Sequence, residues 1–245
     1  MTANDINPQS LIYCVGIFGV ILLASGFYFL SPIYAQNEND SLFSVDSSPY
    51  GKPYKYWTQK WWEWNLSFNA SNHPNNNYTD EKCARGQKAD SPLWFLVQPW
   101  PKPDNKFERT CTIPSGKAVI TATQSGDCNY GALETKTDEA LVNCAKIGND
   151  YTIVQVTVDN KTYKNYEKGR RVTSDFFNVT IIPENVMDYQ NVGKFRAVVD
   201  GYYIFLKPLT PGKHVVYYKF STSPPLGPLQ EYKSNQEGTW NLIVK

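Results

Sequence analysis

Residues 11–30 form an unbroken apolar segment, and this segment constrains the topology of the whole chain. The run LIYCVGIFGVILLASGFYFL contains no charged residue. A helix of this length rises about 30 Å, which matches the hydrocarbon core of a bilayer. We therefore predict that residues 1–35 carry the chain to a membrane and that the remainder folds as a separate domain.

Two interpretations of this segment differ in whether it stays on the mature protein. A secretory signal peptide has a basic start and an apolar stretch of about 7 to 15 residues. Residues 1–10 contain no Lys or Arg, and the apolar stretch here is longer, which favours a retained anchor. The sequence Ile33-Tyr34-Ala35 also resembles a cleavage site, and cleavage there would give a secreted domain.

The rest of the chain is nearly neutral in charge and begins with a polar stretch. Lys and Arg total 24 against 23 Asp and Glu, so no net field draws the protein to nucleic acid. Residues 36–49 are polar and Ser-rich and predict a linker. Residues 50–245 are left for one extracytoplasmic domain, an ordinary size for a β-sandwich.

Four cysteines in this domain indicate its compartment. They are Cys83, Cys111, Cys128 and Cys144. They lack C-x-x-C spacing and the chain has only two histidines, so two disulfides are favoured over a zinc site. Three pairings are open, and we expect the sequential pairs, Cys83 with Cys111 and Cys128 with Cys144. Such bridges persist only in an oxidising compartment, so we expect the domain outside the cytoplasm.

N-x-[ST] sequons are consistent with export. They begin at Asn39, Asn65, Asn69, Asn77, Asn160 and Asn178. Asn69 and Asn77 lie in the stretch NASNHPNNNYT, which has no apolar period and predicts an exposed loop. We expect glycans at Asn69, Asn77, Asn160 and Asn178.

Six aromatic residues recur at steps of four and three and predict an amphipathic helix. They are Tyr50, Tyr54, Trp57, Trp61, Trp64 and Phe68. Pro53 suits the first helical position, and burial of so many rings is strongly favourable. We expect this stripe to pack on a sheet or on a partner. A second helix is expected from its cap at Thr137 to Gly148.

The rest of the domain consists of short apolar runs between turn residues, which predict β-strands. The runs are 94–97, 107–113, 118–123, 151–158, 176–182, 202–207, 213–220 and 240–244. Asp200-Gly201 most simply indicates a turn. The pattern predicts a mainly β fold, an antiparallel β-sandwich with one or two peripheral helices, preceded by an N-terminal transmembrane helix.

A set of short motifs follows in order between residues 50 and 220. They are Tyr50–Tyr54 with Trp57 and Trp61–Trp64, Cys83–Gln87, Trp94–Leu96, Arg109–Lys117, Asp200–Tyr202 and Pro208–His214. The set resembles a family of uncharacterised exported bacterial and archaeal β-rich proteins. The resemblance implies an exported β-rich domain and a bond between Cys83 and Cys111, and it carries no known activity.

The sequence contains no recognisable catalytic motif. It has no G-x-S-x-G, no H-E-x-x-H and no glycine-rich phosphate loop. Two carboxylates about 5 to 9.5 Å apart would still form a glycosidase site, and the acids considered are Glu63, Asp127, Asp175 and Asp200. A surface or turn role is the simpler interpretation of each.

Trp62 and Trp100 are the candidate binding residues. Trp62 lies off the aromatic stripe, and Trp100 lies between Pro99 and Pro101, so we expect both to be partly exposed. Exposed tryptophans stack on sugars or anchor protein contacts. Ordinary packing against flanking loops is the alternative.

These observations lead to three functional hypotheses. The first is a membrane-anchored cell-surface or envelope module with a binding or structural role. The alternatives are a carbohydrate-binding or carbohydrate-processing protein and an accessory subunit of a membrane complex. The expected partners are the membrane, through residues 11–30, and a glycan or envelope protein. No cofactor is required, and a non-enzymatic role is favoured.

Overall fold

The computed structural model describes residues 40–99, 104–164 and 166–245. The chain divides into two units, and the described residues belong to the second, Asn39–Lys245. The predicted membrane segment at residues 11–30 lies outside the described part. Within that part, neither α-helix combines the length and the apolar character that crossing a bilayer requires.

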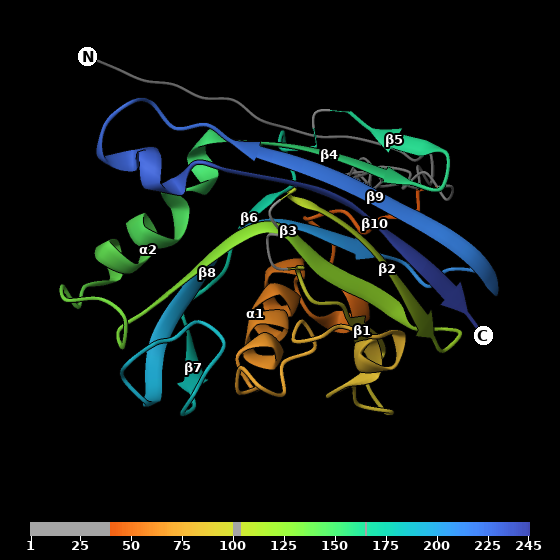
Figure 1. Cartoon of the computed structure of the whole chain (residues 1–245), viewed down its shortest axis with the longest axis horizontal. Coiled ribbons are helices and arrows are strands. Elements are labelled where there is room, and N and C mark those ends of the chain that lie inside the picture. The colour runs from red at the N-terminus through yellow and green to blue at the C-terminus, as the bar shows by residue number, and fades with distance from the viewer. Residues whose placement is uncertain (1–39, 100–103, 165) are drawn as a thin grey trace, which may run out of the picture. The chain divides into compact units, whose positions relative to one another are not determined.

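The described residues form ten strands in two sheets, together with two α-helices (Figure 1). The first sheet has the order β1-β3-β8-β6, and β7 also pairs with β8. Its strands are β1 (Leu93–Phe95), β3 (Ala118–Asn129), β6 (Arg171–Thr173), β7 (Phe177–Ile181) and β8 (Gly193–Leu206). The second sheet has the order β2-β10-β9-β4-β5. Its strands are β2 (Lys106–Ile113), β4 (Thr152–Val158), β5 (Lys161–Tyr163), β9 (Gly212–Thr222) and β10 (Ser234–Val244). The mainly β prediction is confirmed.

The sheets are mixed, which differs from the purely antiparallel prediction. β1 pairs parallel with β3, and β2 pairs parallel with β10. The other pairs are antiparallel. A parallel pair needs a long connection between its strands. The β2–β10 pair joins strands that are far apart in the sequence, Lys106–Ile113 and Ser234–Val244, so local turn signals did not indicate it.

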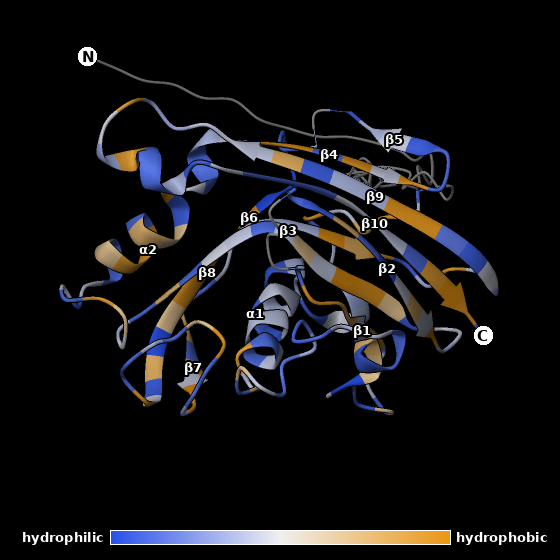
Figure 2. Cartoon of the chain, viewed as in Figure 1, coloured by the Kyte–Doolittle hydropathy of each residue, from blue (hydrophilic) through white to orange (hydrophobic). Residues whose placement is uncertain are grey.

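The two sheets share one hydrophobic core, and α1 (Tyr54–Asn65) packs on the other side of the first sheet (Figure 1). Every residue of β8 from Ala197 to Leu206 is buried, because the strand contributes to the shared core and both α1 and α2 pack against it. Apolar residues are concentrated in the strands, whereas the connecting loops are mostly hydrophilic (Figure 2).

The aromatic stripe forms α1 as predicted. Pro53 is its N-cap, and Tyr54, Trp61 and Trp64 are buried. The Trp61 indole Nε1 donates to the Leu96 carbonyl at 2.8 Å, and the Tyr54 hydroxyl donates to the Tyr203 carbonyl at 3.0 Å. These hydrogen bonds replace those that the buried indole and hydroxyl groups would make with water. They also fix α1 on the first sheet.

The two disulfides join the cysteine pairs that were expected. Cys83 bonds to Cys111 and Cys128 bonds to Cys144, with Cα separations of 5.8 and 6.0 Å. Cys144 lies in α2 (Asp138–Lys146), whose N-cap Thr137 accepts a hydrogen bond from the Ala140 amide as predicted. Each bridge contributes about 3 kcal/mol on the chain-entropy model. The pair indicates an oxidising compartment.

Asp200-Gly201 lies in the middle of β8 rather than in a turn. Opposite it, the register of β3 shifts between Ala122 and Gln124. A Cβ on Gly201 would lie 2.5 Å from the Gln124 carbonyl oxygen. The glycine therefore permits a close approach of two backbones at a β-bulge. Because Asp and Gly are common both at turns and at such bulges, the sequence alone did not distinguish the two.

Two polar stretches pack more closely than expected. Leu42, placed in the predicted linker, is 2% exposed and bridges to Leu206, so the domain begins before residue 50. In the Asn-rich stretch, His73 is 1% exposed and Asn75 is 7% exposed. That stretch is therefore only partly an exposed loop, because its buried members exchange water for hydrogen bonds within the protein.

Candidate binding groove

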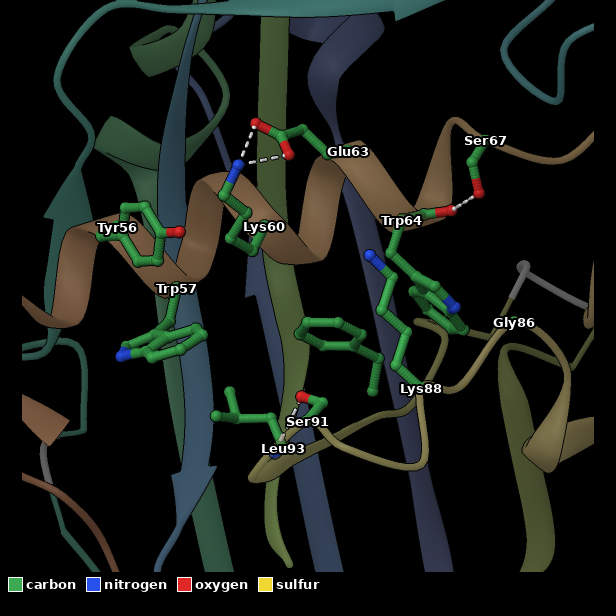
Figure 3. Close-up of a pocket in the computed structure, with 11 residues that line it drawn as sticks. Tyr56, Trp57, Lys60, Glu63, Trp64, Ser67, Gly86, Lys88, Ser91 and Leu93 are labelled. Atoms are coloured by element: carbon green, nitrogen blue, oxygen red, sulfur yellow. Dashed lines mark hydrogen bonds and ion pairs between the residues drawn. The ribbon is translucent and has the colours of Figure 1, made fainter. Parts of the chain in front are cut away.

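A groove of about 530 Å³ lies between α1 and the segment that leads into β1 (Figure 3). Its α1 side consists of Tyr56, Trp57, Lys60, Glu63 and Trp64, with Ser67 just beyond the helix. Its other side consists of Gly86, Lys88, Ser91, Leu93 and Phe95. The groove therefore combines four aromatic rings with three charged side chains.

The aromatic rings form two pairs along the groove. Trp64 and Phe95 lie at 5.4 Å between ring centroids with an interplanar angle of 32°. Tyr56 and Trp57 lie at 5.0 Å in an edge-to-face arrangement. The Trp57 indole Nε1 donates to the Pro49 carbonyl at 2.9 Å, which fixes the orientation of that ring. Trp57 and Phe95 are each partly exposed, so the groove offers apolar ring surface to a ligand.

An ion pair lies beside these rings on the exposed side of α1. The Lys60 ammonium lies 2.6 and 2.9 Å from the two carboxylate oxygens of Glu63. The side chains are 35% and 33% exposed. Lys60 also lies over the Tyr56 ring, 5.3 Å from its centroid. Donors and an acceptor for hydrogen bonds are thus adjacent to the aromatic surface.

The far wall of the groove is held in place by Gln87. Its Nε2 donates to the Phe95 carbonyl at 2.7 Å, and its Oε1 accepts from the Phe95 amide at 2.9 Å. Nε2 also donates to the Cys83 carbonyl at 3.2 Å. The side chain thereby completes the edge of β1 beside the Cys83–Cys111 bridge. The wall is therefore formed before any ligand arrives, as is usual for binding sites.

Two features of the structure require a glycine at position 86. Its φ of +69° lies in the left-handed region, which residues with a side chain disfavour. A Cβ at this position would also lie 2.5 Å from the Phe68 ring and 2.9 Å from the Trp64 indole nitrogen. Within the described residues that buried indole nitrogen has no hydrogen-bond partner. The close approach of Gly86 sets the width of this end of the groove.

The expected exposure of Trp62 was wrong. Trp62 is 4% exposed, and its Nε1 donates to the Tyr203 hydroxyl at 3.0 Å. Its side of α1 faces β8, which the helical period alone does not reveal. Trp100, the other predicted binding residue, lies outside the described residues. The groove residues Tyr56, Lys60 and Phe95 were missed. Tyr56 and Lys60 lie beside the stripe on α1, which was a signal for them, whereas Phe95 lies in β1 and had no such signal.

The candidate carboxylates each contact a different neighbour. Glu63 bonds to Lys60, and Asp175 bonds to Lys55 at 2.7 Å. Asp127 accepts from the Tyr189 hydroxyl at 2.8 Å. Each acid is thus matched to a different neighbour, and Glu63 alone among them lines the groove.

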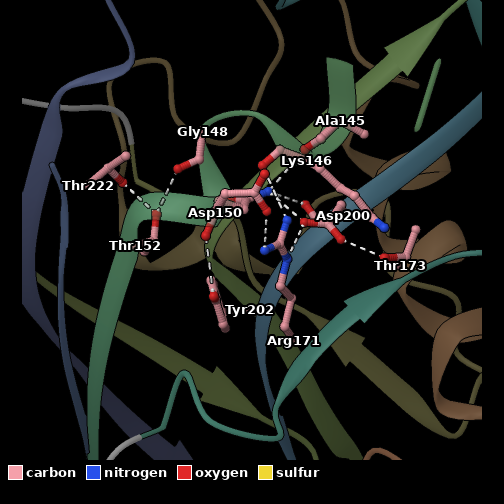
Figure 4. Close-up of polar contacts among 11 residues, drawn as sticks. Ala145, Lys146, Gly148, Asp150, Thr152, Arg171, Thr173, Asp200, Tyr202 and Thr222 are labelled. Atoms are coloured by element: carbon pink, nitrogen blue, oxygen red, sulfur yellow. Dashed lines mark hydrogen bonds and ion pairs between the residues drawn. The ribbon is translucent and has the colours of Figure 1, made fainter. Parts of the chain in front are cut away.

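Asp200 belongs to a buried network at the junction of α2, β6 and β8 (Figure 4). Its carboxylate is fully buried and accepts from Arg171 Nε at 2.7 Å and from the Thr173 hydroxyl at 2.6 Å. Asn149 Nδ2 adds a third contact at 3.1 Å. Arg171 also bonds to Asp150 at 2.6 Å. These contacts satisfy the charged groups within the protein, as a structural role requires.

Two other groups, the buried His73 and the half-buried Asp127, have displaced pKa values. Burial, aided by the charge of Arg109, lowers the pKa of His73 to about 4. The His73 ring contacts the Asn65 side-chain oxygen at 3.1 Å and the Asn75 amide at 3.2 Å. Burial raises the pKa of the Asp127 carboxyl to about 6, although the bond from Tyr189 opposes the shift.

The sequons differ in accessibility. Asn77, Asn160 and Asn178 are exposed. Asn69 is half-buried, and its side-chain oxygen accepts from the Asn72 amide at 3.0 Å. Asn65 is 7% exposed and bonded to His73, so its side-chain amide is not accessible for glycosylation in the folded domain.

No group of three or more potential metal ligands occurs among the described residues. No family model matches the sequence, and no curated protein matches it. Among solved structures, the cysteine protease inhibitor EhICP2 from Entamoeba histolytica is 12% identical, with a TM-score of 0.24 and coverage of 62% of this chain and 94% of that chain. The solution structure of Amebosin is also 12% identical, with a TM-score of 0.19 and coverage of 62% and 96%. Both likenesses are too low to carry an argument about function.

Proposed function

We propose that the protein is an extracytoplasmic binding module and that the groove beside α1 binds carbohydrate. The observation that carries this proposal is that the groove places the partly exposed rings of Trp57 and Phe95 beside the Lys60–Glu63 ion pair. Aromatic rings stack on the apolar faces of sugars. A few placed polar groups then fix the orientation of the ligand.

Binding is favoured over hydrolysis by the composition of the groove. A glycosidase of the usual kind needs two carboxylates flanking the scissile bond. Glu63 is the one acid among the residues that line the groove, and Lys60 already holds it. The same groove is well suited to non-catalytic recognition, because its walls are fixed by Gln87 and by the Trp57 hydrogen bond.

We further propose that this module is tethered to the cell surface through residues 11–30. The length and apolar character of that segment and the two disulfides support export. The exposed sequons at Asn77, Asn160 and Asn178 are compatible with glycosylation in such a compartment. Membership of the uncharacterised exported family that the motifs resemble is part of the same proposal.

A glycan array tests the carbohydrate proposal. The full-length chain in mild detergent would be compared with Tyr56→Ala, which removes one ring from the groove. Loss of one stacking ring is expected to weaken binding about tenfold. The matched control is Tyr232→Ala, because Tyr232 is an exposed tyrosine outside the groove, and it should bind as the unchanged chain does.

Thermal unfolding of both variants would show whether they remain folded. If no glycan binds to the folded unchanged chain, or if both tyrosine variants weaken binding equally, the proposal is wrong. A cell-surface structural role would then be the better hypothesis.

A further inference from the structure

Lys88 differs from the other charged residues of the groove in having no partner. Lys60 and Glu63 hold each other at 2.6 Å. Lys88 is exposed, and within the described part of the chain no hydrogen bond or ion pair involves its ammonium. Two lysines and one glutamate leave the groove with one uncompensated positive charge. The ammonium that carries it is available to a ligand.

The position of Lys88 directs this charge to the groove. Lys88 follows Gln87, whose side chain is bonded to both backbone polar groups of Phe95. The base of the lysine side chain is therefore fixed beside β1. From there the side chain extends toward α1, across the groove (Figure 3). A saccharide stacked on the partly exposed Phe95 ring would lie within its reach.

The acid in the groove does not cancel this preference. A free carboxylate would repel an anionic ligand, but the Glu63 carboxylate is engaged by Lys60 through both oxygens. Its field toward a ligand is largely offset by that ammonium. An anionic substituent therefore gains from Lys88 more than it loses to Glu63.

We propose that the groove selects saccharides that carry an acidic group, and that Lys88 is the residue that determines this specificity. The inference rests on the proposed carbohydrate function and names its ligand class. A lysine ammonium acts as a point charge without the planar geometry of arginine. A uronate carboxylate and a sulfate ester are therefore both acceptable sources of the anion.

Matched ligands test this inference. Tri-galacturonate, its carboxyl-reduced neutral counterpart and a sulfated galactotriose would be titrated calorimetrically into the full-length chain at low salt. Acidic and neutral oligosaccharides that are matched in the same way but have other glycosidic linkages would be compared on the glycan array. We expect about fivefold tighter binding of the acidic member of a bound pair, the size of an exposed ion pair, and a smaller preference at higher salt.

Lys88→Met should bind the acidic and neutral members equally, so the readout is the ratio of the two affinities within one variant. Lys233→Met, an exposed lysine outside the groove, is the matched control and should keep the preference. A preference for uronate, sulfate or both that disappears in Lys88→Met supports the inference and identifies the anion.

Equal binding of acidic and neutral members by the unchanged chain overturns the inference and leaves the carbohydrate function intact. The same holds for an acidic preference that survives in Lys88→Met. Absence of binding to every pair overturns both proposals.

Discussion

Two ion pairs with nearly the same geometry lie in different environments in this domain. Lys60 and Glu63 approach to 2.6 Å at the groove, and Arg171 and Asp200 approach to 2.7 Å in the interior. The groove pair is about one-third exposed, whereas the Asp200 side chain is fully buried. The N–O distance alone therefore does not distinguish an accessible ion pair from a buried structural one. Burial and the number of satisfied contacts do.

The largest expected effect lies in the interior network. Arg171→Met would leave the buried Asp200 carboxylate with hydroxyl and amide donors but no opposite charge. Removal of one partner of a buried pair destabilises by about 3 to 5 kcal/mol, which urea unfolding would measure. Lys55→Met, which breaks the exposed pair with Asp175, is the control. Equal stabilities of the two variants would contradict a structural role for the Arg171 network.

The interior is also expected to respond to pH through two opposed groups. The folded pKa of His73 is about 4, below its ordinary value of 6.5, so its contribution is lost as pH falls from 6.5 toward 4. The folded pKa of Asp127 is about 6, above 3.8, so protonation of Asp127 stabilises the fold as pH falls through 6. Each effect is at most about 3 kcal/mol, and the two nearly cancel in the unchanged chain.

Asp127→Asn separates these contributions. The variant keeps an oxygen that accepts from the Tyr189 hydroxyl but does not titrate. Its free energy of unfolding should therefore fall by up to about 3 kcal/mol more than that of the unchanged chain between pH 7 and pH 4. Urea unfolding at several pH values measures this difference. Parallel pH profiles for the two proteins would show that the Asp127 pKa is not displaced.

Gly86 connects the stability of the domain to the shape of the groove. Gly86→Ala would place a methyl group against Phe68 and Trp64, and overpacking of this kind costs about 1 to 3 kcal/mol. Gly116→Ala is the matched control, because Gly116 also has a positive φ but has nothing within 4 Å of its added Cβ. Its cost should be about 1 kcal/mol, from the backbone alone. Equal thermal shifts would show that the close contact at Gly86 is unimportant.

The smallest effect on stability is expected at the groove pair. Lys60→Met breaks the contact with Glu63, and exposed pairs contribute at most about 1 kcal/mol. The variant should unfold almost as the unchanged chain does, while its binding of glycans changes because Glu63 is released. A large loss of stability would place this pair with the interior network and weaken its assignment to a binding site.

Much of the local structure could be predicted from spacing and capping. The aromatic stripe predicted α1, and Thr137 with the following acids predicted α2. The strands that were missed are short or polar, namely β5 and β6. The second half of β3, the first half of β8 and the first half of β10 were also missed. In β8 the reason is that Asp200-Gly201 resembles a turn when the facing bulge in β3 is unknown.

The candidate site was less accessible to such reasoning. Helical spacing placed Trp62 and the stripe on different faces of α1, but it did not show which face the sheet covers. Trp62 proved to lie on Tyr203, whereas Tyr56 and Trp57 remained accessible. Gln87 and Gly86 were seen as parts of a motif, and their contacts with Phe95 and Trp64 became evident only in the folded chain.

The sequence by itself determined the secondary structure of the helices, because periodicity and capping act between residues that are close along the chain. It left three cysteine pairings open, and the fold selected the sequential pairs that were expected. Tertiary structure decided which aromatic rings reach solvent, which acids are neutralised and where a groove forms. Those properties depend on contacts between distant segments, such as α1 with β1 and Arg171 with Asp200. A linear pattern specifies the periodicity of each element but not the surface against which it packs.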